Sequence, residues 1–455
     1  MSRAIDIVVL AAGRGSRMRS DKPKVLHRLA GRPMIEHVLA ATLGFDNART
    51  VVVSGHGADQ LETALAGYPV SFARQQQQRG TADAVATALG QLREQSIVLV
   101  LYGDVPLIEA DTLHNLISQV NSEQMALLTV TLENPAGYGR ILRDSAAAVV
   151  GIVEQKDATA EQQRIAEVNT GVMAIESGQL RQLLPRIGCD NAQGEYYLTD
   201  LIELAVGSGL SVAVTQPQTA SEVEGVNNRS QLAQLERIYQ RRQASQLLAA
   251  GASLADPDRY DQRGTVTLGE DVFIDINVLL EGNNQIGSNV TIGPHCHLID
   301  AVIGDNVTIK SHTVIEQSQI GAGCVVGPFA RLRPGTQLSE ECKIGNFVET
   351  KKAVLGAGSK INHLSYVGDA TLGRGVNVGA GTITCNYDGV NKHQTVIGDG
   401  AFIGSNTALV APLSIGAGAT VGAGSTIARD VEADKLALTR AKQLTVPGWK
   451  KPLKQ

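Results

Sequence analysis

The sequence lacks the features of membrane, secreted and nucleic-acid-binding proteins. No run of about 18 apolar residues occurs, so no membrane span is expected, and residues 1–13 show no signal-peptide pattern. The five cysteines are far apart and form no C-x-x-C pair, which argues against a disulfide framework or a zinc site and fits a cytoplasmic protein. The net charge is −5 without a long basic block, so nucleic acid is not expected as the main partner.

Aromatic residues are also scarce, at 4% of the 455 residues. The remaining composition, 43% hydrophobic and 19% charged, is typical of a folded chain of two or three domains. Glycine is plentiful but uneven, since 28 of the 48 glycines follow residue 250. The two halves of the chain are therefore expected to be built differently.

An aliphatic residue returns about every six positions from Leu268 to Ile427, with occasional steps of five, the first between Leu298 and Ile303. A period of six fits neither an amphipathic helix nor a plain strand and is typical of a hexapeptide β-helix. We expect a three-sided coil of about nine turns, with the aliphatic residue pointing inward and glycine at many corners. A β-sandwich with glycine turns is the alternative, but it would not keep one period for so long.

The repeat is interrupted between Thr384 and Thr395. The segment 385–394 is too polar to form a side of the coil, so we expect it to be an ejected loop. Such loops commonly line a binding face in solenoid proteins.

Strand-like and helix-like segments alternate in the first half. The segments 5–10, 50–54, 97–101 and 127–130 resemble strands, with helical patterns at 33–43 and 81–92. This alternation predicts a Rossmann-like α/β domain with a mostly parallel sheet, whose ligands bind at the carboxyl ends of the strands. Residues 228–250 have an apolar helical face and predict a connector. We therefore place one domain at 1–227 and the other at 251–455.

Glycine-rich and charged residues follow two of these strands. The first strand leads into Gly13 and Gly15, which let backbone N–H groups approach an anion, while Arg17 and Lys24 add positive charge. The spacing is neither a dinucleotide fingerprint nor a P-loop. Asp104 ends another apolar strand, where a carboxylate suits Mg²⁺ shared with phosphate oxygens. Each feature alone is also typical of a turn or a helix cap.

Together these features resemble the bacterial family of bifunctional N-acetylglucosamine-1-phosphate uridylyltransferase / glucosamine-1-phosphate acetyltransferase enzymes. The resemblance covers nearly the whole chain and rests on Leu-Ala-Ala-Gly-x-Gly-x-Arg-Met (10–18), Tyr-Gly-Asp-Val-Pro (102–106) and the motifs at 194–200, 222–228, 327–335 and 379–389. It implies a left-handed parallel β-helix, a homotrimer, and a product that feeds cell-envelope synthesis.

The resemblance implies that the first domain transfers uridylyl from UTP to N-acetylglucosamine 1-phosphate and releases pyrophosphate. Arg17 and Lys24, with Mg²⁺ on Asp104 and Asn227, would neutralise the reacting phosphates. The residues that would hold the nucleotide and the sugar are Leu10, Ala11, Ala12, Gly13, Lys24, Gln75, Gly80, Thr81, Tyr102, Gly103, Asp104, Gly139, Glu154, Asn169 and Asn227.

The second domain would acetylate the amine of glucosamine 1-phosphate with acetyl-CoA. The resemblance identifies His363 as the general base of this reaction. The residues that would bind glucosamine 1-phosphate are Arg333, Lys351, Tyr366 and Asn377, and those that would bind acetyl-CoA are Ala380, Asn386, Tyr387, Ser405, Ala423 and Arg440.

Two other functions stay open at this point. The chain could be a nucleotidyltransferase with a single activity, whose β-helix only trimerises, or a scaffold without enzymatic activity. The ejected loop and His363 favour two sites over the first alternative, and the charged, glycine-rich loop with Asp104 disfavours the second.

Overall fold

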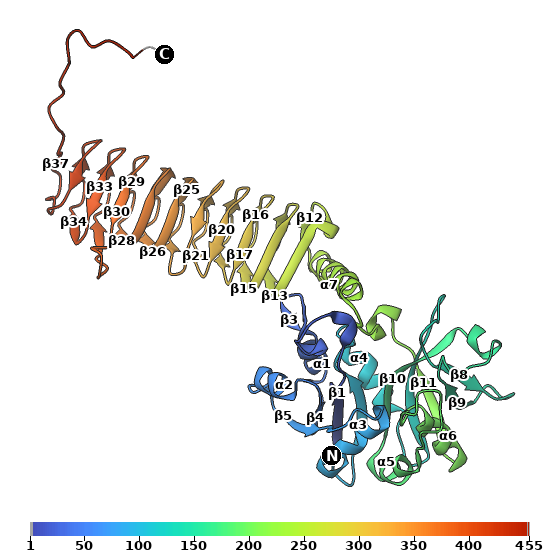
Figure 1. Cartoon of the computed structure of the whole chain (residues 1–455). Coiled ribbons are helices and arrows are strands. Elements are labelled where there is room, and N and C mark those ends of the chain that lie inside the picture. The colour runs from blue at the N-terminus through green and yellow to red at the C-terminus, as the bar shows by residue number, and fades with distance from the viewer. Residues whose placement is uncertain (1–2, 453, 455) are drawn as a thin grey trace. The chain divides into compact units, whose positions relative to one another are not determined.

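The computed structural model describes residues 3–452 and 454, and the chain forms two compact units, Met1–Tyr239 and Gln240–Gln455. Figure 1 shows an α/β unit in blue to green and a solenoid in yellow to red. Within residues 3–452 and 454, no helix is both long and apolar enough to cross a membrane.

The first unit is built on a nine-stranded sheet. Its main path has the order β11-β7-β10-β6-β1-β4-β5, and a hairpin of β8 and β9 extends from β10. The strands are β1 (Ile5–Leu10), β4 (Ala48–Ser54), β5 (Val70–Arg74), β6 (Ile97–Tyr102), β7 (Gln124–Thr131), β8 (Arg140–Arg143), β9 (Val149–Val153), β10 (Glu167–Glu176) and β11 (Ser211–Thr215). The small hairpin β2 (Arg28–Leu29) and β3 (Arg32–Pro33) is separate.

Helices cover both faces of this sheet, as the alternating pattern predicts. They are α1 (Met34–Ala40), α2 (Ala58–Ala64), α3 (Thr81–Ala88), α4 (Ala110–Ser118), α5 (Ser177–Leu183) and α6 (Asp200–Gly207). Every residue of β1 is buried, because its alternate side chains enter two separate apolar clusters on opposite faces. The carboxyl end of β1 therefore lies at the centre of the sheet, where ligands bind in this class of fold.

The pairing also differs from a purely parallel sheet. Strands β4, β5 and β6 continue the parallel arrangement of β1, whereas β10 runs antiparallel to both β6 and β7. The register of β10 shifts between Asn169 and Met173, at the carboxyl end of its neighbour β6. This irregularity brings the β10 backbone close to the carboxyl end of β6, at the edge of the sheet where ligands are expected.

The second unit is a parallel β-helix. Eleven short strands stack into what we call the first wall, which is an unbroken parallel sheet. They are β12 (Ser253–Leu254), β14 (Phe273–Ile274), β16 (Thr291–Ile292), β19 (Thr308–Ile309), β22 (Val325–Val326), β25 (Lys343–Asn346), β27 (Lys360–His363), β29 (Asn377–Val378), β32 (Phe402–Ile403), β35 (Thr420–Val421) and β37 (Leu436–Ala437).

The other two walls are joined where long strands bend around a corner. The strands of the second wall are β17 (His297–Ile299), β20 (Val314–Glu316), β23 (Arg331–Leu332), β30 (Ile383–Cys385), β33 (Ala408–Val410) and β36 (Thr426–Ile427). Those of the third wall are β18 (Val302–Ile303), β21 (Gln319–Ile320), β24 (Gln337–Leu338), β31 (Thr395–Ile397) and β34 (Leu413–Ile415). The long strands that contribute to both are β13 (Tyr260–Leu268), β15 (Val278–Ile286), β26 (Glu349–Leu355) and β28 (Tyr366–Leu372).

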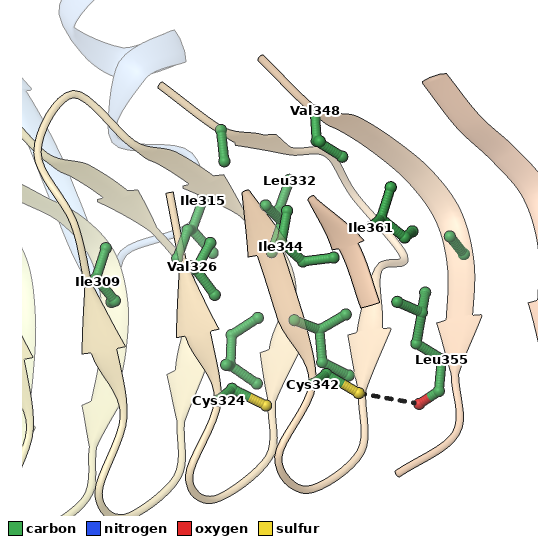
Figure 2. Packing of buried hydrophobic residues seen from close by; sticks show 14 of the residues in the cluster. Ile309, Ile315, Cys324, Val326, Leu332, Cys342, Ile344, Val348, Leu355 and Ile361 are labelled. Carbon is green, nitrogen blue, oxygen red and sulfur yellow. Dashed lines mark hydrogen bonds between the residues drawn. The ribbon is translucent and has the colours of Figure 1, made fainter. Parts of the chain in front are cut away.

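The six-residue period correctly predicts which residues fill the axis. Figure 2 shows Ile309, Ile315, Val326 and Leu332 packed inside the coil, and all four are fully buried. The estimate of about nine coils holds for residues 268–427, where the first wall has nine strands from β14 to β35, and the wall continues by one strand at each end, to Ser253 and to Ala437. At both ends the aliphatic period is irregular, so the sequence pattern does not mark these coils.

The ejected loop is confirmed. In the first wall, β29 pairs directly with β32, although Asn377 and its partner Phe402 are 25 positions apart rather than the usual 17 or 18. The additional residues leave the coil between β30 and β31, over residues 386–394. The connector region is a single helix, α7 (Arg229–Ala249), and the two compact units divide within it.

Candidate functional site

The loop after β1 is pressed against the neighbouring strand β4. The Ala11 backbone N–H donates to the Val53 carbonyl at 2.9 Å, and the His56 N–H donates to the Ala12 carbonyl at 3.2 Å. A Cβ at Gly55 would lie 2.8 Å from the Cβ of Ala12, so only glycine permits this approach. The loop is therefore held in one place on a buried strand end.

A cavity of about 240 Å³ opens beside this loop. It brings together most of the predicted nucleotide residues, which come from the ends of β1, β5 and β6 and the start of α3. The predicted residues in its lining are Leu10, Ala11, Ala12, Gly13, Lys24, Gln75, Gly80, Thr81, Tyr102 and Asp104. Val25, Gln78, Ala84 and Glu195 also line it and were not predicted, although Glu195 belongs to the motif at 194–200.

A carboxylate oxygen and an amide oxygen both lie near one ammonium group at the mouth of this cavity. The Lys24 ammonium is hydrogen-bonded to the Asp104 carboxylate and lies 3.5 Å from Asn227 Oδ1. Arg17 donates to the same Asn227 oxygen at 2.8 Å. The side chains of Lys24 and Asp104 are each only 16% exposed, so their attraction is weakly screened.

This donor set fits Mg²⁺ better than a transition metal. Within residues 3–452 and 454, no group of three or more His, Cys, Asp or Glu residues is placed to hold a metal ion. A carboxylate with an amide oxygen is the kind of partial ligand set that Mg²⁺ completes with water and phosphate oxygens.

The residues predicted for the sugar form a second cluster around Tyr102. Gly171 has φ +84°, and a Cβ there would lie 2.4 Å from the Tyr102 ring, so the β10 backbone can approach the ring closely. The Asn169 N–H donates to the Gly139 carbonyl at 2.9 Å. The Gly103 N–H donates to the Leu10 carbonyl at 3.0 Å, which ties the end of β6 to the end of β1 beside this cluster.

Glu154 completes this cluster. Its carboxylate accepts a hydrogen bond from the Thr199 hydroxyl at 3.1 Å and lies next to Gly139, where a Cβ would be 3.4 Å from Oε1. Burial raises the pKa of Glu154, and the bond from Thr199 opposes part of that rise. Burial, with the nearby charges of Asp104 and Glu154, also raises the pKa of the Tyr102 phenol.

In the β-helix, strand register places His363 in a vertical column of residues from successive coils. The pairing of β25, β27, β29, β32 and β35 aligns equivalent positions on successive coils. Each of these strands is followed by a corner of the coil, and the same register applies to the corner residues. It places five of them one above another: Asn346, His363, Ala380, Ser405 and Ala423. The Asn406 N–H donates to the Ala380 carbonyl at 2.6 Å, and the Gly424 N–H donates to the Ser405 carbonyl at 2.8 Å.

The side chain of His363 is exposed and has one fixed nitrogen. Its Nδ1 is 2.9 Å from Asn346 Oδ1, and because that oxygen only accepts, Nδ1 carries the proton. The neutral ring then has Nε2 as an unprotonated acceptor. Asn346 was not predicted, because only the register shows that it lies one coil below His363.

The predicted phosphate ligands lie on the second wall, around the corner from His363. The register of β23, β26 and β28 places Arg333 next to Lys351, and Lys351 pairs with Gly368. A Cβ at Gly368 would lie 2.3 Å from the Tyr366 hydroxyl, so this phenol folds over the glycine. Glu349 was not predicted and accepts a hydrogen bond from Arg333 at 2.8 Å, which raises the pKa of the arginine further.

The ejected loop brings two more predicted residues to this region. Asn386 is buried, donates to Asp369, and lies close to the space above Gly368. Tyr387 is 57% exposed and its ring faces the Lys392 ammonium at 5.1 Å. Within the loop, His393 Nε2 lies 2.7 Å from Asp388 Oδ2, and this hydrogen bond lowers the pKa of Asp388.

The predicted residues at the end of the coil follow the same arrangement. The Arg440 guanidinium lies beside the corner of residues 422–424, where a Cβ at Gly422 would be 3.7 Å from Arg440 Nη2. Asn377 lies on the first wall and pairs with Lys360 below and Phe402 above. The second-domain residues therefore lie on two adjoining walls, with a continuous column from His363 to Arg440.

Comparison with known proteins agrees with both halves of the structure. Residues 7–168 match the family described as a MobA-like NTP transferase domain, residues 262–346 match the GMPPB C-terminal domain, and residues 394–429 match the bacterial transferase hexapeptide repeats. A solved nucleotidyl transferase from Methanothermobacter is 23% identical, with a TM-score of 0.39, and covers 53% of this chain and 100% of its own.

Full-length relatives share both domains with this chain. The bifunctional protein GlmU of Marinobacter nauticus is 58% identical over 99% of both chains, and that of Cellvibrio japonicus is 56% identical over 99% of this chain and 100% of its own. The GlmU protein of Methylococcus capsulatus is 53% identical over 98% of this chain and 97% of its own. The chain therefore belongs to the family of bifunctional GlmU proteins, which are nucleotidyltransferases and acetyltransferases of UDP-N-acetylglucosamine synthesis.

Proposed function

We propose that the two activities occupy the two sites described above. The β-helix acetylates glucosamine 1-phosphate with acetyl-CoA, and the α/β unit then transfers uridylyl from UTP to the resulting N-acetylglucosamine 1-phosphate. Residues 1–227 carry the second reaction and residues 251–455 the first, with 228–250 as the connector. Because both co-substrates are metabolites of the cell interior and the cysteines are free thiols, the enzyme works in the cytoplasm.

In the α/β unit the cavity beside the β1 loop holds UTP, and the cluster around Tyr102 holds the sugar. The sugar phosphate oxygen attacks the α-phosphorus and pyrophosphate leaves, so two anions must be brought together. Lys24 and Arg17 supply positive charge at the cavity mouth for this purpose. Asp104 and Asn227 would hold Mg²⁺, which when bound supplies further neutralisation of phosphate charge.

Lys24 is hydrogen-bonded to Asp104, so a Mg²⁺ ion held by this carboxylate would require Lys24 to turn away from it. The phosphates of UTP would offer Lys24 another anionic partner.

In the β-helix the observation that carries the proposal is the column above His363. Acetyl-CoA lies along the corners of Ala380, Ser405 and Ala423, beside Arg440, and its thioester is next to His363. Arg333, Lys351 and Tyr366 bind the sugar phosphate on the adjoining wall, while Asn377 contacts the sugar and Asn386 and Tyr387 hold the acetyl end of the coenzyme.

The amine of glucosamine 1-phosphate then attacks the thioester carbonyl. His363 Nε2 accepts the proton that the amine loses, while the bond from Nδ1 to Asn346 stabilises the positive charge on the ring. The carbon–sulfur bond breaks, and coenzyme A leaves as a thiolate that takes up the proton held on His363. No acetyl group is attached to the enzyme, because the amine itself is the nucleophile.

An exposed apolar stack on the β-helix supports assembly as a homotrimer. The rings of His312 and Phe329 stack at 4.6 Å, and those of Phe329 and Phe347 at 5.5 Å, along one corner of the prism. Phe329, Phe347 and Leu364 on the next coil are 47%, 55% and 63% exposed. Such a strip is costly in water, and a second copy would cover it. His363 precedes Leu364 in the chain, so a second copy that covers Leu364 would also shield the acetyl-transfer site.

A coupled assay tests the proposal. Purified protein with acetyl-CoA and glucosamine 1-phosphate is expected to release free thiol, and the addition of UTP and Mg²⁺ is expected to release pyrophosphate. Pyrophosphate release from N-acetylglucosamine 1-phosphate without any thiol release from the amine would favour the alternative of a structural β-helix. Light scattering gives the mass, which we expect to be three times the 48.0 kDa of one chain.

A further inference from the structure

The side chain of Gln75 is held in one orientation at the inner end of the nucleotide cavity. The residue follows β5, is only 5% exposed, and lines the cavity next to Gly80. Its backbone N–H donates to the Ser54 carbonyl at 2.8 Å. Its side-chain Nε2 donates to the Gly80 carbonyl at 3.2 Å and to Asp83 Oδ2 at 2.8 Å.

These two partners determine which end of the amide faces the cavity. A carbonyl and a carboxylate can only accept, so turning the amide over would place Oε1 against two acceptors and lose both bonds. Within the described part of the chain, no donor is bonded to Gln75 Oε1. The oxygen is therefore available as an acceptor for a ligand in the cavity.

Asp83 is itself fixed. Its other oxygen accepts from Arg79 at 2.6 Å, and its side chain is 14% exposed. It also lies in the first turn of α3, where a negative charge is favourable. The carboxylate is thus held in place as the partner of Gln75.

We propose that Asp83 is a positioning residue for base selection, which it exerts through Gln75. This inference rests on the proposed function, in which UTP occupies this cavity. Uracil has a single ring donor, the imino N3–H, whereas N3 of cytosine is an unprotonated acceptor. A fixed acceptor at Oε1 receives a hydrogen bond from the imino group of uracil and faces a lone pair in cytosine.

The same arrangement explains why a carboxylate serves here better than an amide. An asparagine at position 83 could turn its own NH₂ group toward Gln75. The glutamine could then turn over and present its NH₂ group to the cavity. The pair would accommodate either base, so selectivity depends on the carboxylate at Asp83.

The experiment measures kcat and KM for UTP and CTP in the full chain and in Asp83→Asn. We expect the KM for UTP to rise about 3- to 10-fold, the usual effect of one misplaced hydrogen bond, with little change in kcat. We expect the preference for UTP over CTP to fall by about 10-fold or more. An unchanged ratio of kcat/KM values would overturn the inference.

Arg79→Gln is the matched control, because it removes the other partner of Asp83 and leaves the bond to Gln75. The loss of the ion pair near the first turn of α3 is expected to lower the melting temperature. The preference for UTP over CTP is expected to stay unchanged. If both variants change the preference equally, Asp83 acts only through the stability of α3.

A second measurement needs no variant. Uridine 5′-triphosphate methylated at N3 lacks the imino proton, and the wild-type protein is expected to use it at least 10-fold less well than UTP. Equal use of the two nucleotides would refute the acceptor role of Gln75. Failure of the wild-type protein to use UTP at all would instead refute the proposed function.

Discussion

Replacement of His363 by alanine tests the proposed general base of acetyl transfer. The side chain is exposed and its only described hydrogen bond is to Asn346, so its removal leaves no cavity in the coil. The inward residue of the same strand, Ile361, is fully buried and is not touched by the change. We therefore expect the substitution to affect chemistry and not folding.

The size of the effect follows from the loss of a general base. Acetyl transfer is expected to fall roughly 10²- to 10⁴-fold, which corresponds to about 3–5 kcal/mol in the barrier. Uridylyl transfer from N-acetylglucosamine 1-phosphate is expected to be unchanged, because His363 belongs to the other compact unit. Asn346→Leu is expected to lose about 3- to 10-fold, since Nε2 remains but the tautomer and ring orientation are no longer fixed.

The assay follows free thiol with acetyl-CoA and glucosamine 1-phosphate, and follows pyrophosphate separately. Ile361→Ala is the control for a damaged coil, with an expected cost of about 2–5 kcal/mol in stability. A His363→Ala protein whose acetyl transfer fell less than about threefold would refute the base assignment. Loss of both activities together with the native mass would show that His363 is structural.

Three further predictions concern the α/β unit. Asp104→Ala is expected to abolish Mg²⁺-dependent uridylyl transfer and to spare thiol release; near-normal pyrophosphate release would return Asp104 to the role of a turn residue. A fragment of residues 1–227 or slightly longer is expected to keep uridylyl transfer and lose acetyl transfer, and a folded fragment without the first activity would show that the proposed division is wrong. Glu154→Gln is expected to raise the melting temperature by about 1–3 °C at pH 8 and much less near pH 4. Burial raises the folded-state pKa of Glu154 above its ordinary 4.5, so the wild-type protein loses stability as the pH rises from 4.5 through the raised pKa. An equal gain at both pH values would mean that the charge is not the cause.

The sequence predicts the inward residues of the coil well because each depends only on its neighbours in the chain. An aliphatic residue every sixth position must point inward if the walls are flat, and Ile344 and Ile361 do so. The prediction of an ejected loop succeeds for the same reason, since a polar segment cannot fill the axis. The limits of the solenoid are less accurate, because the aliphatic period is irregular in the end coils, and at the N-terminal end Ala244 and Leu247 of α7 contribute to the core.

Other features require the strand pairing. The antiparallel strand β10 has no pattern of its own that distinguishes it from a parallel one, and its position next to β6 follows from the return of the chain across the sheet. The partnership of Asn346 with His363 spans 17 residues and appears only when the coils are stacked. Gln75 and Asp83 likewise meet because β5 leads back to the start of α3.

The central claim, that one chain carries two separable chemistries, is tested most directly by measuring thiol and pyrophosphate in the same reaction. The mixture contains acetyl-CoA, glucosamine 1-phosphate, UTP and Mg²⁺, with the wild-type protein, Asp104→Ala or His363→Ala. We predict that the wild-type protein releases both products, that Asp104→Ala releases thiol alone, and that His363→Ala releases neither until N-acetylglucosamine 1-phosphate is supplied, when pyrophosphate appears. Pyrophosphate release by His363→Ala from glucosamine 1-phosphate at the wild-type rate would contradict the account.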